Sequence, residues 1–581
     1  MTSLSELLDQ WTSDQLKEYV QLLGGNTSIT RKGDRIAFIC QQMLNRDSLA
    51  RLWEQLDQVS QRAVSAAYHN GGEFNIAAFV NQYGVLPPRP EQKNRYWGYL
   101  YQTPILFDLF VDRRHLLIAQ DLMPLLEDLV LPVERFELKG VKTVPKFVEL
   151  EDYSSPVITV ETELIGRTDL LTYLRMVELG HVKLSTTSHR LTAASVRKVA
   201  DNLLNGDYRP LPEKVTGRTT IRPSGLDVFT QESGLVSRSG TLTRTGKEYS
   251  KTRNPEILLT AFEKWSESNG FDELQRITHL SGVGSKKTRL TASGFRRERV
   301  IEALSWCPVD TWISINDFYR AFIIWDFDFE VEETGYSNLY VGSPYYGSLS
   351  GTAYWGVAKG LYISAIIWEY LATLGAVDIA FAEDEYFTVI ETGNLYIDEP
   401  ISQYDSLLYF RINSWGAFLL GQAGDYMPGE PEEKNLFRID DDRRVHLLAD
   451  CPPAERLQLE VLAEQLDEQT YQLDTVKVLT AVEGGQSLEQ ISAFLKTNHP
   501  GDLPSSVADW LAMFQRNQGA FREDGGAVLI HLKQPGLKEL VTNDTSLSKI
   551  CRILDNKTIL IRQSQMTRFR NRLKELGYLL R

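Results

Sequence analysis

Two glycine-rich stretches come close to the spacing of a phosphate-binding loop. Such a loop needs a glycine, four further residues and then Gly-Lys-Ser/Thr, so that backbone amides and one lysine surround the phosphates of a nucleotide. Gly240 is separated from the Gly246-Lys247 pair by five residues, and an acidic residue follows the lysine. The stretch from Gly282 to Thr288 contains no Gly-Lys pair. Because neither spacing fits, the sequence predicts no nucleotide-driven motor in this chain.

Other catalytic patterns are also incomplete. Leu349 occupies the central position of a Gly-x-x-x-Gly stretch where a nucleophile elbow needs serine. His181 and His189 are close in sequence, but no nearby carboxylate or cysteine completes a metal-ligand spacing. We therefore expect a protein that is not an enzyme, with no catalytic residue, no cofactor and no metal ion. The four cysteines are too far apart for a structural zinc site and suit a reducing compartment: Cys40, Cys307, Cys451 and Cys551.

Basic residues are concentrated in the middle of an acidic chain. The net charge is −15, yet residues 181 to 300 contain 21 lysines and arginines against 12 acids, an excess of nine that leaves −24 on the remainder. A basic band on an acidic body steers a phosphate backbone to one face. We predict that this band binds duplex DNA through its phosphates; a solvated segment with a chance excess of charge is the alternative. The candidate residues are Lys183, Arg190, Arg197, Lys198, Arg238, Arg244, Lys247, Lys251, Arg253, Lys286, Lys287, Arg289, Arg296, Arg297 and Arg299.

The start of the band, within residues 156 to 215, has the pattern of a winged helix. Thr168 is placed to cap a first helix, and Thr192 is placed to cap a second one whose apolar face leaves Arg197 and Lys198 outside. Helix N-termini and short hydroxyl side chains bind phosphate oxygens. We expect this turn and helix to face DNA; packing against neighbouring elements is the alternative.

The following segment, residues 216 to 295, changes in composition. Between Thr216 and Arg253 it is rich in glycine, serine, threonine and arginine and has few large apolar residues. Such a composition predicts either a flexible linker or an arm that becomes ordered along a nucleic-acid backbone. Two denser basic clusters follow, at residues 286–289 and 296–299.

Residues 296 to 437 are predicted to form another winged helix with an insertion. A helix from about Ile363 to Leu374 precedes two apolar segments, 377–381 and 386–390, which we expect to pair as the wing. The insertion, from Asp326 to Gly356, mixes acidic and aromatic residues. Aromatic side chains stack on bases or anchor protein partners, and the nearby acids favour a protein contact over a nucleic-acid contact; simple packing is the alternative.

The first 155 residues are predicted to be helical. One helix stops at Gly24-Gly25, and a second begins after the basic loop Arg31-Lys32-Gly33-Asp34. This order of helix, basic loop and helix resembles a SAP-like DNA-binding motif. A plain helical hairpin with a basic connection is the alternative.

The last segment, residues 438 to 581, is predicted to contain a winged helix followed by a short α/β ending. A helix at about 474–482 is followed by a second helix with a capping box at Ser487, and Ser506 opens a third. Residues 521 to 530 then have the pattern of strand, Asp-Gly turn and strand. Three helices and a hairpin make a winged helix.

This last quarter of the chain also carries a spread motif: Gly484-Gly485, Leu503-Pro504, Trp510, Arg516 and Gly577-Tyr578. On these residues it resembles the N-terminal domain of XPB/Ssl2-type helicases and its relatives in bacterial helicase-associated proteins. The resemblance implies a domain beside a DNA-translocating motor. One relative is a non-motor subunit that clamps the motor with a similar domain behind tandem winged helices. Because this chain has no motor, we expect it to be the partner of one.

Length and hydropathy complete the prediction. A chain of 581 residues is long enough for about three to five domains. No N-terminal apolar stretch resembles a signal peptide, which with the scattered cysteines favours a cytoplasmic location. The longest apolar segment, Leu361 to Phe381, is interrupted by Glu369 and Asp378, which predicts a buried helix running into a strand rather than a membrane span.

We therefore predict an α-rich α+β chain with an N-terminal helical domain, tandem winged-helix domains and a C-terminal XPB/Ssl2 N-terminal-like domain. Its predicted function is that of a non-catalytic, DNA-binding, helicase-associated scaffold or accessory subunit. Its predicted partners are duplex DNA and a helicase or another protein subunit, without a membrane. The alternative is a protein-bridging subunit of a phage-defence, transcription or repair assembly without direct DNA contact.

Overall fold

The structure of this protein is a computed structural model that divides into two compact units. They comprise Met1–Glu432 with Ala449–Leu462, and Glu433–Leu448 with Ala463–Arg581. All strand ladders of the described residues are antiparallel, and most elements are helices, so the fold is α+β as predicted. The structure describes residues 2–26, 28–89, 104–132, 134–149, 154–285, 288–333, 338–342, 347, 349–384, 388, 400–427, 435–448, 451–483, 486–517 and 525–580.

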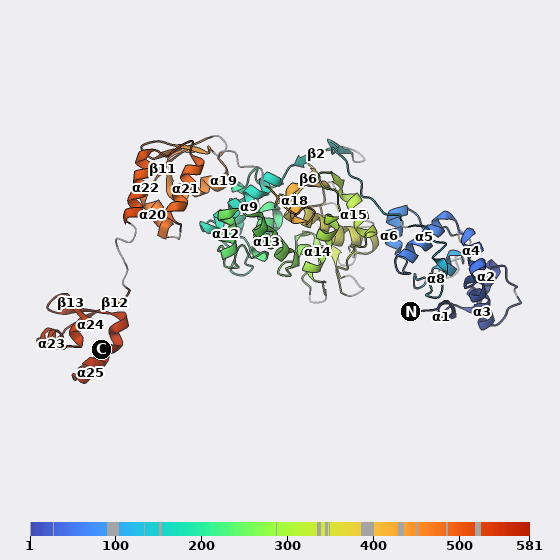
Figure 1. Ribbon diagram of the computed structural model, residues 1–581, viewed down its shortest axis with the longest axis horizontal. Helices are drawn as coiled ribbons and strands as arrows, with labels where there is room; N and C mark the ends of the chain where they lie inside the picture. Colours follow the sequence, from blue (N-terminus) through green and yellow to red (C-terminus); the bar gives the residue numbers. More distant parts are fainter. Residues whose placement is uncertain are drawn as a thin grey trace. The chain divides into compact units, whose positions relative to one another are not determined.

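The N-terminal part of the first unit is helical up to Leu126, as predicted (Figure 1), but Phe147–Glu149 and the start of Ser154–Val160 form strands within the 155 residues that were predicted to be helical. Ser3 and Thr12 form capping boxes at its first two helices. The predicted basic loop is shorter than expected, because the third helix already begins at Lys32, whose ammonium lies 3.0 Å from the Asp9 carboxylate. The helices are α1 (Leu4–Asp9), α2 (Ser13–Leu22), α3 (Lys32–Met43), α4 (Arg46–Glu54), α5 (Gln58–His69), α6 (Ile76–Tyr83), α7 (Phe107–Phe110) and α8 (Met123–Leu126).

A five-stranded sheet organises the rest of the first unit. Its strand order is β1-β2-β6-β7-β4, so strands far apart in sequence lie side by side. β6 is buried along its whole length because side chains cover both of its faces. The strands are β1 (Phe147–Glu149), β2 (Ser154–Val160), β4 (Ile313–Ser314), β6 (Val377–Ala382) and β7 (Leu407–Ile412), and β3 (Leu280–Ser281) pairs separately with β5 (Tyr340–Val341).

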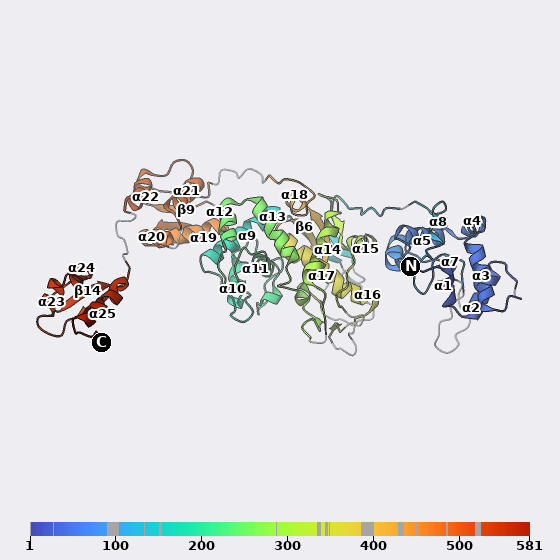
Figure 2. The same cartoon turned by 60° about the horizontal axis from the view of Figure 1, so that its bottom comes forward.

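Helices pack against the inner strands of this sheet, of which β6 is labelled in Figure 2. One continuous helical stretch, from Gly351 to Ala372 and including two π-helical segments, is almost wholly buried and leads into β6. The prediction of a buried helix running into a strand at 361–381 is therefore confirmed. The other helices are α9 (Glu163–Glu178), α10 (Ala193–Asn202), α11 (Arg222–Glu232), α12 (Arg244–Thr252), α13 (Pro255–Glu267), α14 (Ser293–Ser305), α15 (Ile315–Ile324), α18 (Ser414–Leu419) and α19 (Pro453–Leu462), with short 3-10 helices η1 (Gly217–Thr219) and η2 (Glu273–Arg276).

The interpretation of residues 216–295 as a linker is wrong. This segment folds into α11, α12 and α13, and its apolar residues belong to the main hydrophobic core. α11 is buried from Arg222 to Thr230, so its small and polar residues serve close packing rather than solvation. At Gly225 an added Cβ would overlap the carbonyl oxygen of Glu369, which explains a glycine in the middle of a helix.

Two further details of the predicted winged helices are corrected. The first helix of the 156–215 segment begins at Glu163, so Thr168 lies inside α9 and does not cap it. β6 pairs with β2 and β7 rather than with residues 386–390, most of which lie outside the described residues.

The second unit contains two antiparallel sheets with their own helices. Its three predicted helices are confirmed, and the Ser487 hydroxyl accepts the predicted capping-box hydrogen bond from the Gln490 amide at 3.2 Å. The elements are β8 (Phe437–Ile439), β9 (Arg444–Leu447), β10 (Ala463–Gln465), β11 (Thr470–Leu473), α20 (Thr475–Glu483), α21 (Leu488–Asn498), α22 (Ser505–Asn517), β12 (Ala527–His531), α23 (Leu537–Asn543), α24 (Leu547–Ile550), β13 (Cys551–Ile553), β14 (Thr558–Arg562) and α25 (Met566–Glu575), with η5 (Gln563–Gln565) before α25.

The predicted C-terminal hairpin is also corrected. Residues 521–524 lie outside the described residues, and β12 pairs along its length with β14 instead of with a preceding strand. β12 therefore belongs to the C-terminal α/β ending, as the central pairing Leu529 with Leu560 shows. The sheet beside α20, α21 and α22 is β10-β11-β9-β8, which the sequence analysis did not predict.

Among the residues that the structure describes, no helix is both long and apolar enough to cross a membrane.

Candidate nucleic-acid interface

A short hairpin loop and the helix that follows it carry an exposed part of the predicted basic band. The loop, residues 237–241, is closed by an antiparallel bridge between Val236 and Leu242. α12 begins directly after it, because the Thr243 hydroxyl caps the helix by accepting a hydrogen bond from the Gly246 amide at 3.1 Å. An added Cβ at Gly246 would overlap a backbone carbonyl oxygen, so glycine lets the helix pack closely on the hairpin.

α12 exposes a row of basic side chains. Arg244, Lys247 and Lys251 are separated by three and four residues, which places them on one face of the helix, opposite the buried Tyr249. Arg238, in the loop, is exposed as well. Arg238, Arg244, Lys247 and Lys251 together are named the α12 basic surface.

The α12 basic surface has no internal charge compensation in the part of the chain that the structure describes. None of its four side chains makes an ion pair or a hydrogen bond there. Hydroxyl groups lie next to Arg238 in the loop: the hydroxyl oxygen of Ser237 is 2.8 Å from those of Ser239 and Thr241. Free cations and short hydroxyl side chains are the groups that contact phosphate oxygens in protein–DNA interfaces. The surface is therefore chemically suited to a phosphate backbone.

The predicted residues around α10 are largely exposed too. Lys183 and Lys198 are exposed, and Arg197 is exposed while donating a hydrogen bond to a backbone carbonyl at 3.2 Å. Thr192 caps α10 as predicted, accepting from the Ser195 amide at 3.4 Å. The backbone amide of Lys183 donates to the Ser195 hydroxyl at 2.8 Å, which ties the lysine to the first turn of the helix.

Three other predicted residues are held by internal partners. Arg190 forms an ion pair of 2.8 Å with Glu232, and Arg253 forms one of 3.4 Å with Glu455. Arg299 is only partly exposed and donates to two backbone carbonyls, those of Asp326 and Phe327, the second at 3.2 Å. Since these cations are already paired or hydrogen-bonded, their contribution to an external phosphate site is small.

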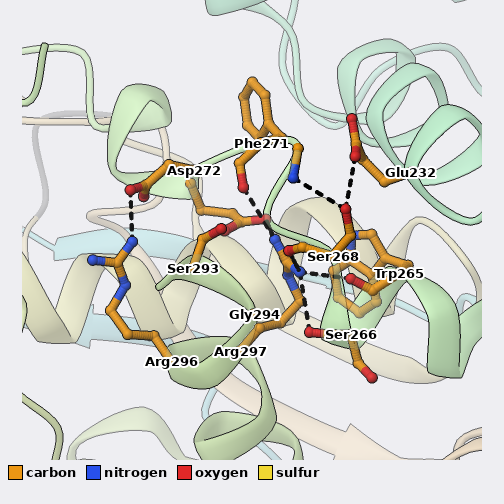
Figure 3. Close-up of polar contacts among 12 residues, drawn as sticks. Glu232, Trp265, Ser266, Ser268, Phe271, Asp272, Ser293, Gly294, Arg296 and Arg297 are labelled. Atoms are coloured by element: carbon orange, nitrogen blue, oxygen red, sulfur yellow. Dashed lines mark hydrogen bonds and ion pairs between the residues drawn. The ribbon is translucent and has the colours of Figure 1, made fainter. Parts of the chain in front are cut away.

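The prediction that Arg296 and Arg297 face a phosphate backbone is wrong. Both side chains are fully buried. Arg296 pairs with Asp272 at 2.6 Å (Figure 3), and Arg297 pairs with Glu273 at 2.6 Å. The Arg297 guanidinium also lies over the ring of Trp265, 4.9 Å from its centroid.

Arg297 has a structural role at the end of α13. Its guanidinium donates hydrogen bonds to the carbonyls of Trp265 (2.6 Å), Ser266 (3.1 Å) and Ser268 (2.8 Å). The last carbonyls of a helix have no partners within the helix and carry its negative dipole end. The buried Arg297 donates hydrogen bonds to these carbonyls and places a positive charge at the negative end of the helix. This basic cluster therefore stabilises the core and does not mark a binding surface.

A second buried arginine links distant elements of the first unit. Arg276 lies 2.8 Å from Glu369, and its guanidinium also donates to the carbonyls of Gly217 and Thr220, each at 2.6 Å. Burial raises the pKa of the Glu369 carboxyl, and the adjacent Arg276 opposes that rise. Burial likewise raises the pKa of the Glu273 carboxyl beside Arg297. Both carboxylates lie in the hydrophobic interior, where each accepts hydrogen bonds from its arginine partner.

The remaining predicted residues fall into two groups. Arg289 is exposed, and Lys286 and Lys287 lie outside the described residues. Within the described ranges, no group of three or more His, Cys, Asp or Glu side chains is placed to hold a metal ion.

The helical arrangement of the α12 basic surface was not predicted, because the composition of residues 216–253 is that of a linker. The signal was present: Thr243 is followed three residues later by Gly246, whose amide donates the capping hydrogen bond to the Thr243 hydroxyl, and Arg244, Lys247 and Lys251 have helical spacing.

Comparison of the sequence with protein-family models gave no match, and comparison with curated proteins gave none either.

Proposed function

We propose that this protein is a non-catalytic subunit that binds duplex DNA through phosphate contacts of the α12 basic surface. The observation that carries the proposal is the contrast within the basic band: Arg296 and Arg297 are buried and paired, whereas the four cations of the α12 basic surface are exposed and uncompensated in the described structure. Phosphate contacts dominate non-specific affinity for DNA. Binding through this surface therefore depends little on base sequence.

The order of elements supports winged-helix modules as the framework of this proposal. From α14 onward the chain runs helix, strand, helix, the short strand β5, buried helix, strand and strand, and β7 lies between β6 and β4 in the sheet. α9, α10, α11 and the 237–241 hairpin follow a similar course of three helices and a hairpin. Because α11 is buried, we assign DNA contact in this module to the hairpin and α12 rather than to its third helix.

We further propose a DNA motor as the protein partner. The support is the resemblance of residues 438–581 to the N-terminal domain of XPB/Ssl2-type helicases, together with the absence of a phosphate-loop spacing in the sequence. In this proposal the chain acts as a scaffold that holds a helicase on DNA.

A titration of fluorescent duplex DNA, followed by anisotropy at several salt concentrations, tests the DNA contact. Glutamate at Arg238, Arg244, Lys247 and Lys251 is expected to weaken binding at least about tenfold for every duplex sequence and to reduce the slope of log affinity against log salt by about 0.9 per lost phosphate contact. The matched control is glutamate at four other exposed lysines of the same unit: Lys17, Lys139, Lys142 and Lys146.

The control changes net charge equally and is expected to have a much smaller effect. Equal losses in both variants, or no loss in the first, would remove the α12 basic surface from DNA binding. The protein-bridging alternative would then lead. It is favoured by one observation in the second unit, where α20 exposes the apolar side chains of Val476 (70%) and Leu479 (43%).

A further inference from the structure

The last 55 residues form a second basic region that the central band does not include. Residues 527–581 contain 11 lysines and arginines against four acids, in a chain whose net charge is −15. This excess of seven is spread over fewer than half as many residues as the excess of nine in the central band. A region of that charge density attracts polyanions.

These residues have their own sheet and core. The strands β12, β14 and β13 pair only with one another in the described structure, in the order β12-β14-β13. One side of the sheet is covered by helices, because Ile530, Ile559 and Ile561 are buried together with Val541 of α23 and Phe569 of α25. The labelled elements β12, β13, α23, α24 and α25 appear together in red in Figure 1.

The acids of this region are mostly occupied by internal contacts. Asp544 and Glu575 both pair with Arg572, at 2.7 and 2.6 Å, and Asp555 accepts a hydrogen bond from the Lys557 backbone amide at 2.6 Å. The basic side chains are mostly free. Seven of them are exposed and make no side-chain ion pair or hydrogen bond in the described structure: Lys533, Lys549, Arg552, Lys557, Arg568, Arg570 and Lys574.

The opposite side of the sheet is less covered among the residues that the structure describes, where Leu529 and Arg552 are exposed and Leu560 is half-buried. Side chains alternate along a strand, so Leu529, Arg552 and Leu560 point away from the buried isoleucines. The pairing register sets these three residues in one row, because Leu560 of the central strand lies opposite Leu529 on one side and Arg552 on the other. Leu529 is 49% exposed. Leu529, Leu560 and Arg552 are named the open sheet row.

A duplex does not fit this surface well. The major groove admits an α-helix or a two-stranded ribbon, whereas this face belongs to a three-stranded sheet. A single strand can lie across a sheet, with its unstacked bases against apolar side chains and arginine planes and its phosphates near basic residues. The open sheet row supplies two apolar side chains and one guanidinium.

We propose that the C-terminal region, residues 527–580, is a separate binding site for single-stranded nucleic acid, with the open sheet row as its contact surface. The site does not depend on the α12 basic surface. The two proposals therefore concern different ligands: the α12 basic surface binds duplex DNA, and the open sheet row binds an unpaired strand.

The test uses the full chain and two fluorescent 20-nucleotide probes, oligo(dT) and oligo(U), in anisotropy titrations. The first variant, Leu529→Glu with Arg552→Glu, is expected to weaken binding of at least one probe on the order of tenfold and to leave duplex binding nearly unchanged. The matched variant, Lys496→Glu with Thr497→Glu, makes the same change in net charge at exposed positions of α21, outside residues 527–580. It is expected to change affinity for the single strand less than threefold.

A milder substitution guards against misfolding of the first variant. Arg552→Gln keeps a polar side chain at an exposed position, and it is expected to lower the salt slope for the probe by about 0.7, the value for one phosphate contact of a single strand. Loss for oligo(dT) alone identifies DNA as the ligand, and loss for oligo(U) alone identifies RNA. No binding of either probe by the unmodified chain, or equal losses in the two glutamate variants, would overturn the proposal.

Discussion

Replacing Arg297 with methionine tests whether the basic cluster at residues 296–299 of the central band belongs to the core. The side chain is fully buried, pairs with Glu273 at 2.6 Å and donates to three carbonyls at the end of α13. Removing one partner of a buried ion pair costs about 3–5 kcal/mol because the other charge remains unpaired. A carbonyl left without a donor adds about 1–3 kcal/mol where water cannot reach it. We expect a loss of at least about 4 kcal/mol in the free energy of unfolding.

Urea unfolding followed by tryptophan fluorescence measures this loss, because Trp265 lies directly beneath the Arg297 guanidinium. With a slope of about 3 kcal/mol per molar urea, the midpoint is expected to fall by more than about 1 M. Arg289→Met is the matched control at an exposed arginine of the same band, and its effect is expected to stay within about 0.5 kcal/mol.

A double substitution separates the ion pair from the helix-end contacts. Arg297→Met with Glu273→Met removes both charges, so it is expected to be less destabilised than Arg297→Met alone by about 1–3 kcal/mol. A folded Arg297→Met protein with an unchanged urea midpoint and reduced DNA affinity would refute the reasoning, because it would show that the arginine acts on an external ligand.

Three further predictions concern other parts of the chain. The isolated protein is expected to hydrolyse no ATP with or without DNA, and turnover in a coupled assay that disappears in Lys247→Ala would contradict this. Trp510 packs on Phe514 with ring centroids 4.9 Å apart and is 9% exposed. Trp510→Ala is therefore expected to lower the free energy of unfolding by about 3–5 kcal/mol and to reduce the helix signal in circular dichroism. A folded variant that has lost only the binding of a protein partner would disprove this prediction. The Arg572 guanidinium lowers the pKa of Asp544 to about 2, so this carboxylate stabilises the fold above about pH 4, and the contribution is lost as the pH falls towards 2. A carboxyl titration by NMR checks this value, which is expected to return towards 4 in Arg572→Gln.

Local signals in the sequence predicted many elements correctly. The capping box at Ser487 and the cap at Thr192 mark helix starts that the structure confirms. These signals are local, because the hydroxyl of a capping residue accepts a hydrogen bond from a backbone amide within three residues of it. The apolar segment at 361–381 likewise predicted a buried helix and a strand, because an exposed element of that length would contain more than two acidic residues.

Strand partners were less predictable than helices. β12 was assigned to a hairpin with the residues just before it, but it pairs with β14, more than 25 residues later in the chain. The same holds for β6, whose partners β2 and β7 come from before and after it in sequence. Which strands pair depends on the whole set of apolar faces to be buried, and turn signals report only the nearest connection.

The linker interpretation failed for a different reason. Small residues lower the mean hydropathy of residues 216–253, yet in α11 they allow close contact, as Gly225 does against the backbone of Glu369. Composition alone does not distinguish a helix buried through close packing from a solvated chain. The spacing of the few large apolar residues is a local helical signal, because Leu226 and Phe229 are three residues apart and both are fully buried.

Charge counts carry the same ambiguity, since they do not separate a cation used inside the fold from one available outside it. Arg276 and Arg297 add to the formal charge of the central band, but their partners Glu369 and Glu273 neutralise them in the interior. Near the C-terminus the relation is reversed, because Arg572 alone occupies two of the four acids and most other cations stay exposed. The capacity of a basic segment to bind a polyanion therefore depends on how many of its basic side chains already pair with acidic residues of the fold. By that criterion α12 and residues 527–580 are the stronger candidates for nucleic-acid binding.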